Sequence, residues 1–228
     1  MKKSRNDVQF QKPFFYPWVG LKYGCDGVKR VMIVGASHYC EKSEAAIDKC
    51  PYSCGKCSVR CRCMTREVIN CYLKNGARTG WVKTFTKFIN SLYGREASQP
   101  EREAVFDHVV FMNYLQRVEG SVSREKHNEY FKEPCHFRAF CNVILRYRPD
   151  VIIVWGDRVW DAILGSICDN EPDMDYKIAK RGWTADVRVN DFTFKLLSVY
   201  HPSYYRYETA DNPHGRFKKF GVTFPLRK

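Results

Sequence analysis

The chain has 228 residues, enough for a single domain that buries about 70% of the surface exposed by its unfolded form. Its 38 Lys and Arg residues exceed its 25 Asp and Glu residues by 13, so the field around it favours polyanionic partners. A soluble basic surface without such a partner is the alternative. No segment approaches the ~18 consecutive apolar residues of a membrane span, and residues 1–7 lack the apolar stretch of a secretory signal. We therefore expect a cytoplasmic protein, present as a monomer.

The first predicted element is a buried strand over residues 31–34, because four consecutive apolar residues precede Gly35. After it, the segment from about 40 to 63 has no apolar period, and its cysteines and charges predict an irregular insertion. Thr65 is expected to cap a helix that ends near Lys74.

Apolar residues at helical spacing predict a second helix, which Gly94 ends. Its inner face is expected to consist of Trp81, Phe85, Phe88, Ile89 and Leu92. A buried strand over residues 108–112 then leads to Asn113. A third helix is marked by apolar residues between 137 and 145, and it is expected to end before Arg148.

The most apolar strand is expected over residues 151–156, followed by a helix. We assign Trp155 and Trp160 to the core, because they belong to this strand and to the inner face of that helix. Residues 187–200 alternate between apolar and polar around a central turn, which predicts a hairpin that leads directly to His201.

Strands that alternate with helices predict an α/β fold, with three layers and a doubly wound, mostly parallel sheet. We find neither an internal repeat nor a linker that divides the chain. Residues 1–228 are therefore expected to form one domain that carries the Cys-rich insertion.

Small and polar residues follow three of the predicted strands, where each apolar run ends. These segments are Gly35-Ala36-Ser37-His38-Tyr39, Asn113 and the tripeptide His201-Pro202-Ser203. The carboxyl ends of strands in an open α/β sheet are where such folds build ligand sites. We therefore expect a Gly-led loop, an amide and an imidazole to converge on one pocket, of a kind that recognises a nucleic-acid base.

The order of these segments, with Asn113 extended to Asn113-Tyr114-Leu115-Gln116, resembles the uracil-DNA glycosylase superfamily. The stretch 148–160, an Arg-Pro strand followed by Gly and a helix, is also similar to that superfamily. Together, the three segments resemble more closely still an uncharacterised bacterial branch that shares the fold. The resemblance implies a DNA repair hydrolase, a base-excision enzyme that cleaves the N-glycosidic bond of uracil or a related altered base in DNA.

The chemistry of base excision gives these residue types their expected roles. The departing base becomes an anion, and a hydrogen-bond donor aimed at it lowers the barrier by roughly 3–4 kcal/mol. His201 is the candidate donor. Asn113 offers one donor and one acceptor, which match the O4 and N3–H of uracil and oppose the pattern of cytosine. The resemblance thus assigns base binding to Gly35, Asn113 and Ser203, and catalysis to Ser37, His38 and His201.

The first loop departs from the superfamily pattern, which has Asp, Asn or Glu where this chain has Ser37 and His38. His38 is a candidate general base, since an unperturbed histidine pKa of about 6.5 suits that task. The alternative is a loop histidine bonded to backbone. A missing carboxylate is otherwise available from the insertion, at Glu41, Glu44 or Asp48.

The departure leaves two classes of function open. One is a glycosylase, and the other is a catalytically altered module that keeps the fold and binds nucleic acid. Aromatic side chains beside Lys and Arg, as at Tyr204, Tyr205 and Arg206, are what nucleic-acid binding uses for stacking and for phosphate contact. The retained Asn113 and His201 favour the enzyme.

Six of the eleven cysteines fall between residues 40 and 63. The spacing of the last five predicts a metal site, because dense thiolates repel one another unless a cation neutralises them. These candidate ligands are Cys50, Cys54, Cys57, Cys61 and Cys63. We expect Zn²⁺, with a structural iron–sulfur cluster as the second choice and free thiols as the alternative.

The first three of these cysteines also have the spacing found in radical S-adenosylmethionine enzymes. We reject that class, because Lys56 stands where those enzymes have an aromatic residue and the predicted strands do not form their barrel.

Overall fold

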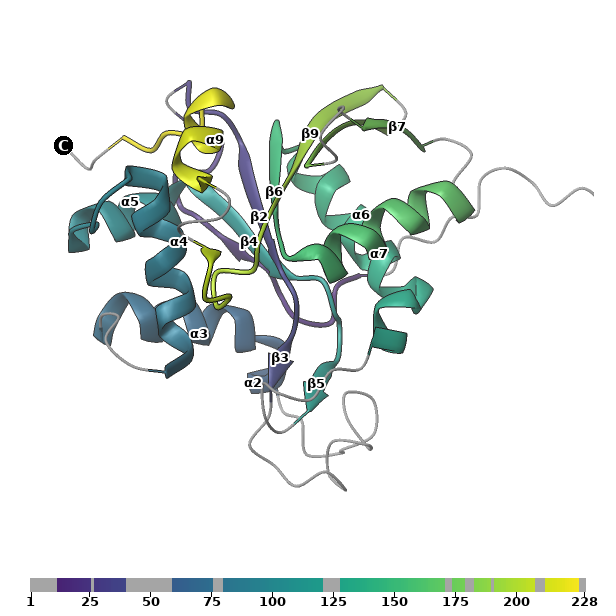
Figure 1. Ribbon diagram of the computed structural model, residues 1–228. Helices are drawn as coiled ribbons and strands as arrows, with labels where there is room; N and C mark the ends of the chain where they lie inside the picture. Colours follow the sequence, from purple (N-terminus) through teal and green to yellow (C-terminus); the bar gives the residue numbers. More distant parts are fainter. Residues whose placement is uncertain are drawn as a thin grey trace, which may run out of the picture.

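The computed structural model describes residues 12–25, 27–39, 59–75, 80–120, 128–170, 174–178, 183–189, 191–207 and 212–225. In this part of the chain, seven strands form one sheet in the order β1-β4-β2-β6-β9-β8-β7 (Figure 1). In that order the strands are Trp18–Val19, Val109–Asn113, Val31–Gly35, Val151–Trp155, Phe192–Val199, Thr184–Val189 and Met174–Ile178.

The four central strands, β4, β2, β6 and β9, run parallel to one another. Antiparallel strands flank them, with β1 beside β4 on one side and β8 and β7 beyond β9 on the other. A separate two-stranded sheet joins β3 (His38–Tyr39) to β5 (Val118–Gly120). The predicted strands and the hairpin are confirmed, whereas β1, β3, β5 and β7 were not expected from the sequence.

Helices cover both faces of the large sheet, which confirms the three-layer α/β prediction (Figure 1). One face carries α3 (Met64–Asn75), α4 (Lys83–Tyr93), α5 (Gln99–His108) and α9 (Pro213–Lys219). The other carries α6 (Pro134–Tyr147) and α7 (Asp157–Asn170). The short elements are α2 (Val59–Arg62), η1 (Gly80–Val82) and η2 (Asn128–Lys132). No helix of the described chain is both long and apolar enough to cross a membrane.

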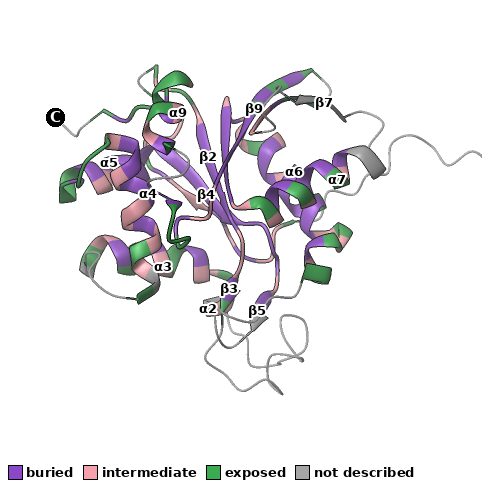
Figure 2. Cartoon of the chain, in the orientation of Figure 1, coloured by how far each residue is buried: buried purple, intermediate pink, exposed green. Residues whose placement is uncertain are grey.

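Strands β2 and β6 and the first four residues of β4 contain only apolar residues and glycine, because both faces of the sheet are covered there. In β2, Val31 and Ile33 join the core beneath α3, α4, α5 and α9, whereas Met32 and Val34 join the core beneath α6 and α7. Figure 2 shows β2 and β4 buried along their length. Trp155 and Trp160 are buried, as the sequence analysis predicts.

Two predictions near the insertion are wrong. Thr65 does not cap a helix but lies inside α3, which begins at Met64. Its hydroxyl instead forms a hydrogen bond with the buried ring of His38. The segment predicted to be irregular up to residue 63 ends in helix α2, which contains Cys61. The rest of the insertion lies outside the described residues.

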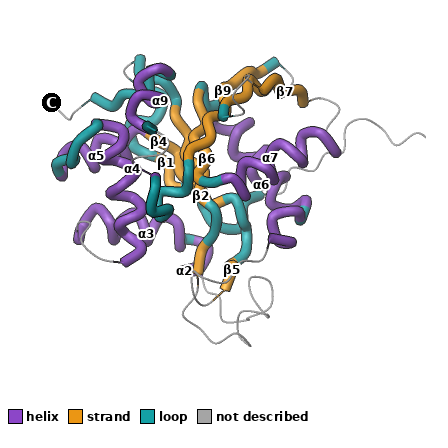
Figure 3. The backbone as a smooth tube through the Cα atoms, in the orientation of Figure 1, coloured by secondary structure: helices purple, strands orange, loops and turns teal. Residues whose placement is uncertain are grey.

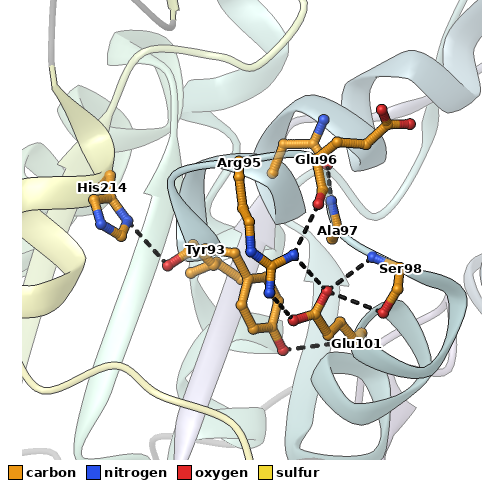
Figure 4. A network of polar contacts seen from close by, with 9 residues as sticks. Tyr93, Arg95, Glu96, Ala97, Ser98, Glu101 and His214 are labelled. Carbon is orange, nitrogen blue, oxygen red and sulfur yellow. Dashed lines mark hydrogen bonds and ion pairs between the residues drawn. The ribbon is translucent and has the colours of Figure 1, made fainter.

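Helix α5 is absent from the sequence prediction, although its amino end carries a capping box. Glu101 accepts a hydrogen bond from the backbone N–H of Ser98, 2.8 Å away, and the Ser98 side chain caps the helix in return. Arg95 forms two hydrogen bonds with the same carboxylate (Figure 4). The hydrogen bond from Arg95 lowers the pKa of Glu101 to about 2, more than offsetting its burial. The network fixes the turn between α4 and α5.

Candidate functional site at the carboxyl edge of the sheet

The four parallel strands end at one edge of the sheet, and that edge is the candidate site. Gly35 pairs with Asn113, and Trp155 pairs with Val199. The chain leaves β2 for β4 on one side and later returns to β6 on the other, which makes β2 the topological switch point. Figure 3 shows the loops after β2 and β4 leaving this same end of the sheet toward β3 and β5.

The amide of Asn113 is fixed by contacts on two sides. Its Nδ2 donates to the backbone oxygen of Ser37 at 2.9 Å. Its Oδ1 lies so close to Gly35 that a Cβ atom at position 35 would come within 2.3 Å of it. Oδ1 accepts no hydrogen bond from the residues that the structure describes. Gly35 is therefore required for the amide to lie where it does, which the sequence pattern does not reveal.

The buried side chain of Gln116 stabilises the backbone at Asn113 through hydrogen bonds, a role that the sequence analysis misses. Its side-chain Nε2 donates to the backbone oxygen of Asn113 at 2.9 Å, and its Oε1 accepts from the backbone N–H of Phe14 at 2.8 Å. Gln116 is buried. The only sequence signal for it is its place three residues after Asn113, within the segment that carries the family resemblance.

His201 comes two residues after the end of β9, next to Trp155, the last residue of β6. Its Nδ1 accepts hydrogen bonds from Ser203, with the backbone nitrogen at 3.2 Å and the hydroxyl oxygen at 2.7 Å. Because a backbone N–H can only donate, Nδ1 is unprotonated in the neutral ring and the proton is on Nε2. His201 thus has an N–H donor on the side of the ring away from Ser203.

The turn before helix α7 allows His201 to approach this edge. Gly156 has a φ of 89°, and a Cβ atom there would lie 3.3 Å from the Cβ atom of His201. The indole of Trp155 lies against the imidazole, with ring centroids 6.0 Å apart. A side chain at position 156 would disturb both contacts.

The sheet register sets the spacing between the two principal groups. Asn113, Gly35, Trp155 and Val199 form one row across β4, β2, β6 and β9. Three strand spacings separate the ends of that row, about 14 Å at roughly 4.8 Å per spacing. Asn113 and His201 therefore flank the ends of β2 and β6, and Ser37 is held beside Asn113.

His38 does not have the environment that a general base needs. Its Nε2 lies 2.8 Å from the hydroxyl of Thr65, and Phe15 packs edge-on against its ring with centroids 4.7 Å apart. Burial lowers the pKa of His38 to about 3. The geometry therefore favours the structural alternative, with a side-chain hydroxyl as partner in place of the expected backbone group.

The candidate carboxylates Glu41, Glu44 and Asp48 lie outside the described residues, as do the candidate metal ligands Cys50, Cys54 and Cys57. Cys61 and Cys63 are partly buried, and neither forms a disulfide; they lie at the start of the helical region that follows. The predicted zinc site at these cysteines remains a prediction.

Another group of candidate metal ligands lies at the start of α6, where Glu133, Cys135 and His136 have ligand atoms within 4.8 Å of one another. Nδ1 of His136 accepts the backbone N–H of Gln116 at 3.1 Å, so the ring proton is on Nε2, which faces Glu133 at 3.5 Å. Burial also raises the pKa of the Cys135 thiol, which disfavours the thiolate that a metal requires. The group fits a hydrogen-bond network better than a metal site.

The described edge therefore combines three features: an amide of fixed orientation, a glycine that admits it, and an imidazole whose tautomer is set. Together they provide donors and an acceptor for a flat, polar ligand. No protein-family model matches the chain, and no curated protein matches it at a significant level.

Proposed function

We propose that the protein is a DNA base-excision N-glycosylase that hydrolyses the bond between deoxyribose and uracil or a related altered base. The observation that carries the proposal is the fixed amide of Asn113 on the same edge of the sheet as the N–H donor of His201. The uracil-DNA glycosylase-like order of these segments supports it, as does the +13 charge, which favours DNA as a partner.

Asn113 is the proposed base-reading residue. Its Oδ1 is suited to accept the N3–H of uracil, and the Nδ2 hydrogen not used by Ser37 is suited to donate to O4. Cytosine presents the reverse pattern at these two positions. Gly35 contributes by leaving room for the amide, so base recognition depends on a residue with no side chain of its own.

His201 is the proposed electrophilic residue. Cleavage breaks the bond between N1 of the base and C1′ of the sugar, and the bonding pair leaves with the base. The Nε2–H of His201 stabilises the negative charge that develops on the base oxygen. A water oxygen then bonds to C1′, and the proton that it releases balances the charge of the departed base. Ser203 fixes the imidazole tautomer that this step needs.

One observation favours the second candidate, a nucleic-acid-binding module without glycosylase activity. Residues 36–39 contain no carboxylate, and burial lowers the pKa of His38 so far that it is a poor base. If the enzyme is active, a carboxylate that positions water must come from elsewhere, and Glu41, Glu44 and Asp48 are the candidates in the insertion.

The test is incubation with oligonucleotides that carry uracil, hypoxanthine or other altered bases, followed by alkali to cut abasic sites. His201→Ala should slow cleavage about a hundredfold or more. Asn113→Asp should alter base preference, because an ionised carboxylate only accepts. Leu21→Ala is the control, because the side chain of Leu21 is 90% exposed. If the wild type cleaves none of these bases but binds DNA in a salt-dependent manner, the binding module is the correct function.

A further inference from the structure

A row of aromatic side chains continues outward from the end of β9. It consists of Trp183, Tyr200, Tyr204 and Tyr205, and we call it the aromatic ladder. Successive ring centroids are 5.2, 5.2 and 4.8 Å apart. These spacings are those of rings in direct contact. The ladder joins the entry to β8 with the loop that follows His201.

An arginine lies at each end of the aromatic ladder. The guanidinium carbon of Arg216 is 5.1 Å from the ring centroid of Trp183, and that of Arg206 is 5.1 Å from the ring centroid of Tyr205. Arg216 also donates to the backbone oxygen of Trp183 at 3.2 Å, which holds its guanidinium in place. Planar cations next to aromatic faces bind both bases and phosphates.

The outer part of the aromatic ladder is exposed to solvent. Tyr205 is 71% exposed and Tyr204 is 39% exposed, and both belong to the few large apolar or aromatic side chains that are exposed in the described chain. Exposed rings in a sequence with 13 more basic than acidic residues point to an anionic ligand with flat groups. A protein partner would satisfy the rings equally well but would leave the excess of positive charge unexplained.

We propose that the aromatic ladder binds unpaired bases of single-stranded DNA, with Arg206 and Arg216 contacting its phosphates. The bases of a duplex are stacked on one another and cannot present a face to Tyr205, whereas those of a single strand can. Tyr200 of the aromatic ladder directly precedes His201. The orientation of the bound strand therefore rests on the proposed function, which places the nucleotides that neighbour the target base on the tyrosines. The proposal also specifies that the enzyme prefers single-stranded substrate.

The test measures binding of a fluorescently labelled single strand of thymidines by anisotropy, with a hairpin duplex of equal length as comparison. Tyr205→Ala should weaken binding of the single strand about tenfold, the scale of one lost stacking contact. Tyr205→Phe keeps the ring and should bind like the wild type. Binding of the duplex should change little in either variant. Leu21→Ala controls for a general surface effect, because the Leu21 side chain is more exposed than that of Tyr205.

The charge of Arg206 provides a second readout. Arg206→Gln should reduce the slope of log affinity against log salt by about 0.7, the value for one phosphate contact on a single strand. An unchanged slope would remove Arg206 from the interface. Equal affinity of wild type and Tyr205→Ala for the single strand, or equal loss in Tyr205→Phe and Tyr205→Ala, would overturn the stacking proposal, as would a wild type that prefers the duplex.

These results separate the two proposals, because the thymidine strand carries no base to excise. Binding that depends on Tyr205, together with no cleavage of any altered base, would leave the aromatic ladder as a binding surface and reject the glycosylase. Cleavage that His201→Ala abolishes, together with unaltered binding in Tyr205→Ala, would keep the glycosylase and reject the aromatic ladder as a stacking surface.

Discussion

Gly35 and Asn113 occupy the same small volume at the end of two neighbouring parallel strands. A Cβ atom on the glycine would lie 2.3 Å from the amide oxygen of the asparagine, closer than any non-bonded contact allows. The amide in turn holds the loop after β2 through its hydrogen bond to the backbone oxygen of Ser37. The loop that follows β2 is therefore positioned by Asn113, the last residue of β4.

Gly35→Ala should displace the amide of Asn113 and destabilise the protein by about 1–3 kcal/mol, the usual cost of overpacking. Gly165→Ala is the matched control, since Gly165 lies within α7 and a Cβ atom there meets nothing within 4 Å. That control should stabilise the protein by about 0.5–1 kcal/mol through helix propensity. Unfolding in denaturant measures both, and equal effects of the two substitutions would refute the close contact.

Ser203→Ala tests the tautomer of His201. The variant loses the hydroxyl that lies 2.7 Å from Nδ1 but keeps the backbone N–H. We expect cleavage to slow about fivefold, the scale of one hydrogen bond of about 1 kcal/mol, and far less than in His201→Ala. Rates measured from pH 5 to 9 should show a changed pH profile as well as a lower maximum. A loss as large as that of His201→Ala would contradict the supporting role of Ser203.

The buried His38 makes the fold sensitive to acid. Burial lowers the pKa of His38 to about 3, so between that value and about 6.5 the unfolded chain takes up a proton that the folded chain does not. Stability should therefore fall as the pH drops through this window. His38→Gln should show a shallower dependence of unfolding free energy on pH. Thr65→Val should be less stable throughout but keep the slope, because burial and not the hydroxyl lowers the pKa.

Glu101 should add a second loss of stability at lower pH. The hydrogen bond from Arg95 lowers the pKa of Glu101 to about 2, so its contribution is complete above the ordinary value of about 4.5 and disappears as the pH falls toward 2. Glu101→Gln should remove this part of the acid transition and destabilise the protein near neutral pH. Glu96→Gln is the control, since that side chain is 85% exposed. Thermal unfolding at pH 3, 5 and 7 distinguishes them.

Metal analysis tests the predicted zinc site. Protein purified without chelator should contain about one equivalent of zinc, and Cys54→Ser should lose it. Cys135→Ser should retain it, because the group around His136 fits a hydrogen-bond network better than a metal site. Iron in place of zinc would favour the structural cluster. Absence of both metals would leave free thiols.

Strands β2, β4 and β6 could be predicted from the sequence because a strand covered on both faces needs an uninterrupted apolar run, whereas β9 could be predicted from its alternation of apolar and polar residues. The edge strands could not be predicted. Strand β1, for example, has only two residues, and it forms by pairing with Phe111, which is far from it in the sequence. Helix α5 escaped prediction because its apolar residues lack a clear period, although Ser98 and Glu101 carry a recognisable cap signal. Local periodicity thus identified the central strands and most of the helices that cover them, but neither the edge strands nor helix α5.

The site could be predicted in part for a related reason. Residues such as Asn113 and His201 follow apolar runs, and the ends of parallel strands necessarily meet at one edge. The burial of His38 and the bracing by Gln116 depend on residues far along the chain, Thr65 and Phe14 among them, and no local pattern reports such contacts.

The hydrogen bond between His38 and Thr65 has a consequence for the segment that joins Tyr39 to Val59. The two residues are 27 positions apart in sequence, yet their side chains meet, so the two ends of this part of the chain lie close together. The entropy of closing a loop grows only with the logarithm of its length, about 0.6 kcal/mol for each doubling. The cost of bringing His38 and Thr65 together therefore depends only weakly on the number of residues between them.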